Sequence, residues 1–182
     1  MNKLIELPPR VTIYPTNYCY KKCKHCIFVL ENSLNSAEIE FDLLNRVLQD
    51  LATHKVLLVG IAGGDPLKYP NILNMIKTVI ELGMIPILTL SGANLNDSSI
   101  IQLFECGVRS VQLSLDGAKS TTYDLMRGSG SFYETIEAIE LLNRVGINVS
   151  LATYLLQENL IEFDMLMELA ISLKINKVKV QR

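Results

Sequence analysis

Short runs of apolar residues alternate along the chain with longer segments in which apolar residues recur at helical spacing. The clearest helical pattern covers residues 38–53, whose apolar face consists of Ile39, Leu43, Leu44, Val47, Leu48 and Leu51. The same pattern predicts helices at residues 70–82, 97–106 and 131–145, each followed by a glycine stop, and at residues 160–173. The apolar runs between them predict strands at residues 10–14, 56–62, 85–90, 108–115, 147–154 and 177–180.

Strands that alternate with helices indicate βαβ units and a parallel sheet. The predicted strands read as continuous apolar runs, so we expect helices to cover one face of the sheet and a packed interior to fill the other. Right-handed crossovers repeated in one direction would curl such a sheet. We therefore expect an α/β fold, a parallel (β/α)6 partial TIM barrel, with a doubly wound open sheet as the competing arrangement.

The composition is that of a folded domain, because 49% of the 182 residues are hydrophobic and 20% are charged. The formal net charge of -2 argues against nucleic acid as a partner. No apolar run reaches membrane-spanning length and the first residues lack a signal-peptide core, so we expect a cytoplasmic protein. We expect residues 1–182 to form one domain. Since the chain stops directly after the sixth predicted strand, we also expect the natural protein to continue beyond Arg182.

Three of the four cysteines, Cys19, Cys23 and Cys26, lie in one short segment after the first predicted strand. In a reducing cytosol, clustered cysteines are more often metal ligands than disulfide partners. Three thiolates at this spacing can wrap one metal centre, and a cluster of four irons would keep one iron without a protein ligand. A structural zinc site would need a fourth ligand, for which Cys106, His54 or a distant carboxylate remain. An electron carrier would normally have a fourth cysteine near its cluster.

Two segments that follow predicted strands have the composition of ligand-binding turns. In Gly63-Gly64-Asp65-Pro66, the glycines let a ligand approach the main chain, and free carbonyls on such a turn suit an ammonium group. Ser91 opens a polar loop after the third predicted strand. Taken alone, the first segment would be interpreted as an ordinary strand-to-loop turn, and the alternative for the second is a plain polar loop.

Polar residues also stand at the ends of the fourth and fifth predicted strands, where parallel barrels bind ligands. Ser114 and Asp116 are two residues apart and are expected to share one face, and Thr153 ends the next strand. Arg127 precedes a glycine-rich entry into a helix, a position that favours an anion, and its guanidinium suits a carboxylate. Plain strand ends and a solvated arginine are the alternatives.

The spacing Cys-x3-Cys-x2-Cys, after the first strand of a βα-repeat chain, resembles the radical S-adenosylmethionine (SAM) superfamily. The resemblance covers the chain roughly from residue 11 to residue 182. It implies that Cys19, Cys23 and Cys26 bind three irons of a [4Fe-4S] cluster, while the amino and carboxylate groups of SAM chelate the fourth iron. It also implies that His25 packs its ring beside the cluster.

The two strand-end turns are similar to motifs of the same family. Gly63-Gly64-Asp65-Pro66 looks like the Gly-Gly-Glu-Pro motif that holds the SAM amino group, with the shorter Asp65 where the family more often has glutamate. The loop that begins at Ser91 resembles, loosely, a Thr-Asn-Gly segment near the ligand.

Two further segments resemble the peptide-modifying, SPASM-type branch of the family. Ser114-Leu-Asp116-Gly is similar to its Ser-Leu-Asp-Gly segment, in which the serine approaches the ribose and carboxylate of SAM. The stretch that begins at Tyr123 is similar to a His-Asp-x-x-Arg-Gly-x-x-Gly-x-Phe motif, with tyrosine replacing the histidine. The resemblance implies that Arg127 binds the SAM carboxylate and that Thr153 lines the adenine side.

What the resemblance implies is a radical SAM enzyme, in which the cluster reductively cleaves SAM to a 5′-deoxyadenosyl radical that abstracts a substrate hydrogen. The expected substrate is a peptide or a cofactor precursor, and the expected electron donor is a flavodoxin or a ferredoxin. Two other classes remain open at this point: a non-catalytic iron–sulfur electron-transfer protein and a zinc-stapled scaffold.

Overall fold

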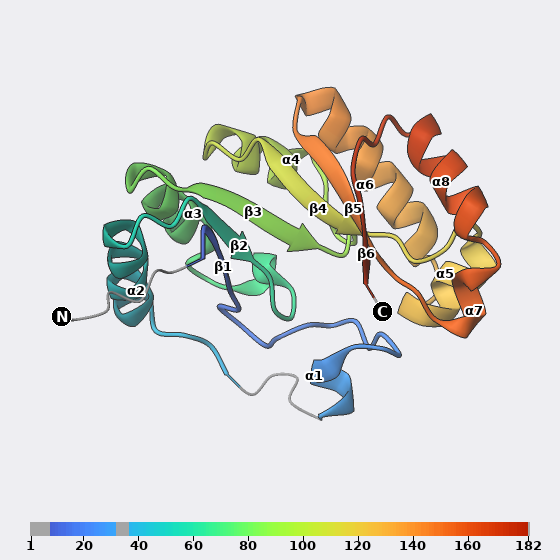
Figure 1. Ribbon diagram of the computed structural model, residues 1–182, viewed down its shortest axis with the longest axis horizontal. Coiled ribbons are helices and arrows are strands. Elements are labelled where there is room, and N and C mark those ends of the chain that lie inside the picture. Colours follow the sequence, from blue (N-terminus) through green and yellow to red (C-terminus); the bar gives the residue numbers. More distant parts are fainter. Residues whose placement is uncertain (1–7, 32–36, 182) are drawn as a thin grey trace.

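Six parallel strands form one continuous sheet in the computed structural model, which describes residues 8–31 and 37–181. The strands are β1 (Arg10–Ile13), β2 (Leu58–Ile61), β3 (Ile85–Leu90), β4 (Ser110–Ser114), β5 (Asn148–Tyr154) and β6 (Val178–Gln181). They lie in sequential order and every neighbouring pair is parallel. A doubly wound sheet reverses its strand order, whereas this sheet runs in one direction and curls into a half-barrel with helices on its convex side (Figure 1). The predicted partial barrel is confirmed.

Helices follow the strands in the expected alternation. They are α1 (Ile27–Leu30), α2 (Phe41–Thr53), the 3-10 turn η1 (Pro66–Lys68), α3 (Ile72–Glu81), α4 (Asp97–Glu105), α5 (Ser120–Arg127), α6 (Ser131–Val145), α7 (Gln157–Leu160) and α8 (Phe163–Ser172). Within the described residues, no helix is long and apolar enough to span a lipid bilayer.

Two predicted helix boundaries are wrong, each because of a long-range contact. Helix α2 begins at Phe41 rather than at residue 38, because the Ile39 N–H donates to the Pro15 carbonyl (2.9 Å) and holds this segment extended. The helix predicted at residues 160–173 begins only at Phe163, as α8, and the separate short helix α7 precedes it. Between them, the buried Glu162 carboxylate accepts hydrogen bonds from the Ala118 N–H (3.2 Å) and the Thr122 hydroxyl (2.6 Å).

The prediction of a packed interior on the concave face is also wrong. The core lies between the sheet and the helices, where residues such as Val59, Leu88, Val111 and Leu113 are fully buried. Alternate positions of the same strands face the concave side and are polar in most strands, as in the β4 sequence Ser-Val-Gln-Leu-Ser. The strands therefore alternate in the way that a sheet with one open face requires.

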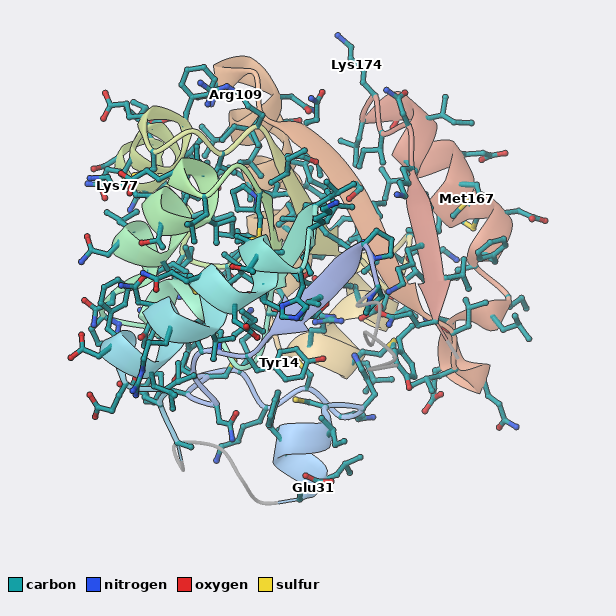
Figure 2. All side chains as sticks on the ribbon, turned by 60° about the vertical axis from the view of Figure 1, so that its left-hand side comes forward. Tyr14, Glu31, Lys77, Arg109, Met167 and Lys174 are labelled. Carbon is teal, nitrogen blue, oxygen red and sulfur yellow. The ribbon has the colours of Figure 1, made fainter. Side chains whose placement is uncertain are left out.

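The loop between β1 and α1, which carries the three clustered cysteines, crosses the rim at the carboxyl ends of the strands. Its far end is anchored by an edge-to-face contact between the rings of Tyr14 and Phe28, with 6.0 Å between centroids. Figure 2 shows Tyr14 directly beside α1, whose C-terminal end carries the labelled Glu31. Because this rim is where parallel barrels bind their ligands, the cysteines lie at the functional end of the fold.

Candidate active site

Backbone hydrogen bonds fix the cysteine loop to two neighbouring elements. The turn after β2 donates from Gly64 N–H to the Thr16 carbonyl (2.9 Å) and from Asp65 N–H to the Tyr18 carbonyl (2.7 Å). Further along, the Lys24 N–H donates to the Met126 carbonyl of α5 (3.0 Å). The cysteines are thus held from both sides before any ligand binds.

The two glycines of the turn after β2 are required by the closeness of this contact. Gly63 has a φ of +124°, and a Cβ at this position would lie 2.6 Å from the Thr16 carbonyl oxygen. A Cβ on Gly64 would lie 2.2 Å from the Tyr18 carbonyl oxygen. Any larger residue would therefore push the cysteine loop away from the rim.

All three clustered cysteines line one cavity of about 240 Å³ at the carboxyl ends of the strands. Of the nine residues that the sequence suggested for SAM binding, five line the same cavity, namely Gly63, Gly64, Ser91, Ser114 and Arg127, and His25 lines it as well. In the described part of the chain, no three His, Cys, Asp or Glu side chains are grouped around a single-ion site. The thiols instead face a shared space.

The remaining four predicted residues lie behind the cavity wall. Asp65 turns its carboxylate onto its own backbone and accepts from the Leu67 N–H (3.1 Å), and Pro66 is buried at the start of η1. The Thr153 hydroxyl is fully buried and donates to the Leu115 carbonyl (2.7 Å). The fourth residue, Asp116, has no exposed surface and anchors a polar network.

The Asp116 carboxylate holds Arg127 against the cysteine loop. One carboxylate oxygen accepts from the Tyr154 N–H (2.7 Å), and the other accepts from Arg127 Nε. The guanidinium then places Nη1 4.0 Å from Cys23 Sγ and Nη2 3.2 Å from His25 Nε2. Burial is the largest single effect on Arg127 and lowers its pKa, but Asp116, Tyr123 and Cys23 together outweigh burial and raise the pKa of the guanidinium. The arginine is a fixed cation in this wall.

The His25 ring is neutral and carries an unused donor. Burial, with Arg127 beside it, lowers the pKa of His25. Because a guanidinium only donates, His25 Nε2 must accept, which assigns the ring proton to Nδ1. Nδ1 is buried and has no hydrogen-bond partner among the described residues. The ring itself stacks on Tyr154, with 5.1 Å between centroids and 21° between planes.

Burial and the Arg127 cation act on the protonation of the clustered thiols. Burial raises the pKa of Cys19 and of Cys23, and at Cys23 the Arg127 cation acts in the opposite direction. A bound metal reverses such a shift, since coordination deprotonates a thiol outright. Three buried or half-buried sulfurs on one cavity, with an orphaned N–H donor beside them, therefore fit a metal–sulfur centre.

Several cavity residues escaped the sequence analysis, among them Lys21, Thr89, Tyr154 and Gln181. The last three lie near the carboxyl ends of β3, β5 and β6, at positions where alternate residues face the concave side. The alternation of polar and apolar residues in the strands was the signal that could have found them. Lys21 is held by contacts across the chain, to the Ser131 hydroxyl (2.5 Å) and the Glu134 carboxylate (3.1 Å), which local sequence cannot reveal.

A parallel half-barrel with a three-cysteine loop at its carboxyl rim defines the core of a metal–sulfur enzyme. The chain belongs to the radical SAM superfamily, whose family model matches residues 13–170. Membership implies a [4Fe-4S] cluster and SAM as cofactors, and the donor set described above fits that cluster.

Two similar curated proteins are a heme synthase and a peptide cyclase. An AdoMet-dependent heme synthase of Methanosarcina barkeri is 27% identical over 153 residues, which are 84% of this chain and 44% of that protein. A PqqA peptide cyclase of Rhodopseudomonas palustris is 25% identical over 175 residues, covering 96% of this chain and 46% of its own length. The chain thus spans less than half the length of these two relatives.

The fold is also that of a solved peptide-binding relative. Streptococcus suis SuiB bound to the precursor peptide SuiA superposes with a TM-score of 0.84 at 24% identity, covering 96% of this chain and 39% of SuiB. SuiB has also been solved bound to S-adenosylmethionine, with a TM-score of 0.80. At this level of identity the likeness shows the fold, including the curl of the half-barrel.

Proposed function

We propose that the chain is the catalytic core of a radical SAM enzyme that modifies a peptide or a cofactor precursor. The observation that carries the proposal is the convergence of Cys19, Cys23 and Cys26 on one cavity at the carboxyl rim of a parallel half-barrel. When bound, the cluster and SAM supply one-electron reductive cleavage of SAM, which gives methionine and a hydrogen-abstracting 5′-deoxyadenosyl radical. The protein's part is to bind, orient and shield these groups.

The charged and polar residues of the cavity fit the polar ends of SAM. Arg127, fixed by Asp116 beside Cys23, offers its guanidinium to the SAM carboxylate. Carbonyls of the Gly63-Gly64 turn suit the SAM ammonium group, and Ser91 and Ser114 add hydroxyl groups to the same wall. His25 lines the same cavity, and its Nδ1 has no hydrogen-bond partner among the described residues.

Four residues act indirectly in this proposal, because they do not line the cavity. Asp65 and Pro66 shape the turn that carries the glycines, and Thr153 fastens the end of β5 to β4. Asp116 is a positioning residue: its carboxylate bonds to Arg127 and to the Tyr154 N–H, and therefore sets two parts of the cavity wall.

The relatives of this chain support a peptide or a cofactor precursor as substrate. A PqqA peptide cyclase, a heme synthase and a protein bound to its precursor peptide are all similar to this chain. We also propose that residues 1–182 act as one core domain in the cytoplasm. The flavodoxin or ferredoxin expected as electron donor belongs to the same proposal.

Anaerobic reconstitution followed by product analysis tests this function. The purified chain is loaded with iron and sulfide, reduced with dithionite and incubated with SAM. We expect about four irons and four sulfides per chain, and formation of methionine and 5′-deoxyadenosine. If the purified chain contains zinc without iron or sulfide, it is a zinc-stapled scaffold. If it binds a cluster but leaves SAM intact, it is an electron carrier. Either result would overturn the proposal.

A further inference from the structure

A second cavity lies on the same concave face, toward the amino ends of the strands and away from the cysteines. It has a volume of about 230 Å³, and its lining includes Arg10, Ser110, Gln112, Lys174 and Lys177. Arg10 begins β1 and Lys177 directly precedes β6, which are the two edge strands of the sheet. The curl of the half-barrel therefore brings both edges to one cavity.

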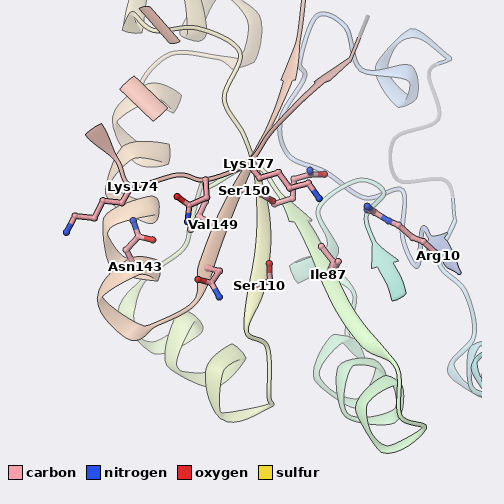
Figure 3. Close-up of a pocket in the computed structure, with 11 residues that line it drawn as sticks. Arg10, Ile87, Ser110, Asn143, Val149, Ser150, Lys174 and Lys177 are labelled. Atoms are coloured by element: carbon pink, nitrogen blue, oxygen red, sulfur yellow. The ribbon is translucent and has the colours of Figure 1, made fainter. Parts of the chain in front are cut away.

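The charges of this cavity have one sign. Its lining contains Arg10, Lys174 and Lys177 but no Asp or Glu, and the six strands contain no acidic residue either. In the described part of the chain, none of these three cations forms an ion pair. Figure 3 shows Arg10 and Lys177 extending toward one another across the opening, while Lys174 extends the other way.

Converging cations are unusual in a chain with more acidic than basic residues. The protein has 19 acidic and 17 basic side chains, and other cations do find partners, as Lys21 does with Glu134 and Lys119 with Glu162. Two cations that face the same cavity repel each other, and an anion bound between them offsets this electrostatic repulsion. The arrangement is electrostatically complementary to a bound anion.

We propose that this cavity is an oxyanion subsite that takes a carboxylate or phosphate group between Arg10 and Lys177. The planar guanidinium of an arginine suits either group through two parallel hydrogen bonds, and the lysine adds a point charge. Gln112 extends the donor set, since its Oε1 accepts from the Thr89 hydroxyl (3.5 Å) and its amide N–H groups are left for the cavity. The Ser110 hydroxyl lines the same space.

The subsite lies along the same strands as the cofactor cavity. We call the cavity with Arg10 and Lys177 the lower cavity and the cavity with the cysteines the upper cavity. Ser110 lines the lower cavity and Ser114 lines the upper one. The two serines are four positions apart on β4, which corresponds to about 13 Å along the strand. A substrate that spans both would carry its acidic group at about that distance from the reacting atom. This last step rests on the proposed function, whereas the subsite itself does not.

Calorimetric titration of small anions tests the subsite. Inorganic phosphate and glutarate are titrated separately into the full chain with its cluster reconstituted, at low ionic strength. The test variant is the double substitution Arg10→Gln with Lys177→Gln, and the matched control is Lys174→Gln, whose lysine lines the cavity but points away from the pair. Iron content and circular dichroism establish that all three proteins are equally folded.

We expect saturable binding of at least one anion to the unmodified chain, weakened by about tenfold or more in the double variant because charged hydrogen bonds are lost. The control should bind as the unmodified chain does. Tighter binding of phosphate would assign a phosphorylated ligand, and tighter binding of glutarate an acidic carboxylate ligand. Absence of saturable binding, or equal weakening by Lys174→Gln, would overturn the subsite. Neither result would affect the cleavage of SAM, so the two proposals fail separately.

Discussion

The two cavities of the concave face are built from the same strands but treat charge in opposite ways. At the carboxyl rim, the buried Arg127 is bonded to Asp116 and contacts His25. At the amino ends, Arg10 and Lys177 have no acidic partner among the described residues. The upper site is therefore fixed before its ligands arrive, whereas the lower one depends on an anion from outside the sheet.

The loops explain the difference. Above the carboxyl ends lie the cysteine loop, the turn after β2 and helices α5 and α7, which bring side chains from distant parts of the chain over the strands. Below the amino ends, turns of two to five residues connect α4, α6 and α8 to the strands that follow them. Each of these turns contains a residue with positive φ, namely Gly107, Gly146 or Lys174. The longer loops at the carboxyl ends of the strands therefore preorganise the upper cavity, at the end where other parallel barrels also build their sites.

The largest effect should come from removing a cysteine of the upper cavity. Cys23→Ala leaves two thiols for the cluster, and we expect the variant to lose nearly all iron and sulfide after reconstitution. Cys106→Ala is the control, since this cysteine lies outside the cavity at the end of α4. Metal and sulfide analysis measures both. Equal iron in Cys23→Ala and the unmodified chain would remove the loop from the site.

Breaking the ion pair between Asp116 and Arg127 should cause the largest loss in the free energy of unfolding. Asp116→Ala leaves Arg127 without its carboxylate in a wall where its side chain is only 13% exposed, so we expect a loss of about 3 kcal/mol. Lys177→Ala, at the exposed lower cavity, should change stability by less than about 0.5 kcal/mol. Urea unfolding measures both variants. Equal losses would mean that the two cavities do not differ in preorganisation.

The glycine turn should couple stability to cluster binding. In Gly64→Ala, the new methyl group clashes with the Tyr18 carbonyl, so we expect a loss of about 1–3 kcal/mol together with reduced iron content. Gly83→Ala is the control, because a Cβ there meets nothing within 4 Å and adds only backbone strain at φ +78°. The control should lose some stability but keep its iron. Full iron in Gly64→Ala would show that the loop tolerates displacement.

The smallest loss of stability should come from removing the Tyr154 ring, which stacks on His25. Tyr154→Leu removes the contact with His25 but keeps the backbone N–H that donates to Asp116, so we expect a loss of about 1 kcal/mol. Thermal unfolding at fixed pH measures it. A loss as large as that of Asp116→Ala would mean that the ring, rather than the carboxylate, organises the wall.

The architecture could be predicted from sequence because it depends on local patterns. Residues 85–90 and 131–145 form an apolar strand and a helix with a glycine stop, and both boundaries agree with the structure. Sequence analysis also found about half of the residues that line the cysteine cavity, because those residues lie in short motifs at strand ends. Helix α5 escaped, since only Tyr123 and Met126 of its eight residues are buried.

What could not be predicted depends on contacts between distant residues. The sequence suggested Asp116 as a ligand-binding residue, but its bonds to Arg127 and to the Tyr154 N–H exist only once three elements meet. The lower cavity likewise needs β1 and β6 to approach each other, although Arg10 and Lys177 are far apart in sequence. Reading the strands as uniformly apolar hid the polar concave face from the start.

Electron paramagnetic resonance of the reduced, reconstituted protein tests the central claim most directly, because it reports whether SAM reaches the cluster held by the three cysteines. We expect the spectrum of the unmodified chain to change when SAM is added. In Arg127→Ala, the same change should require about tenfold more SAM, because the cation that meets the SAM carboxylate is gone. A spectrum that SAM leaves unchanged in the unmodified chain would contradict the account.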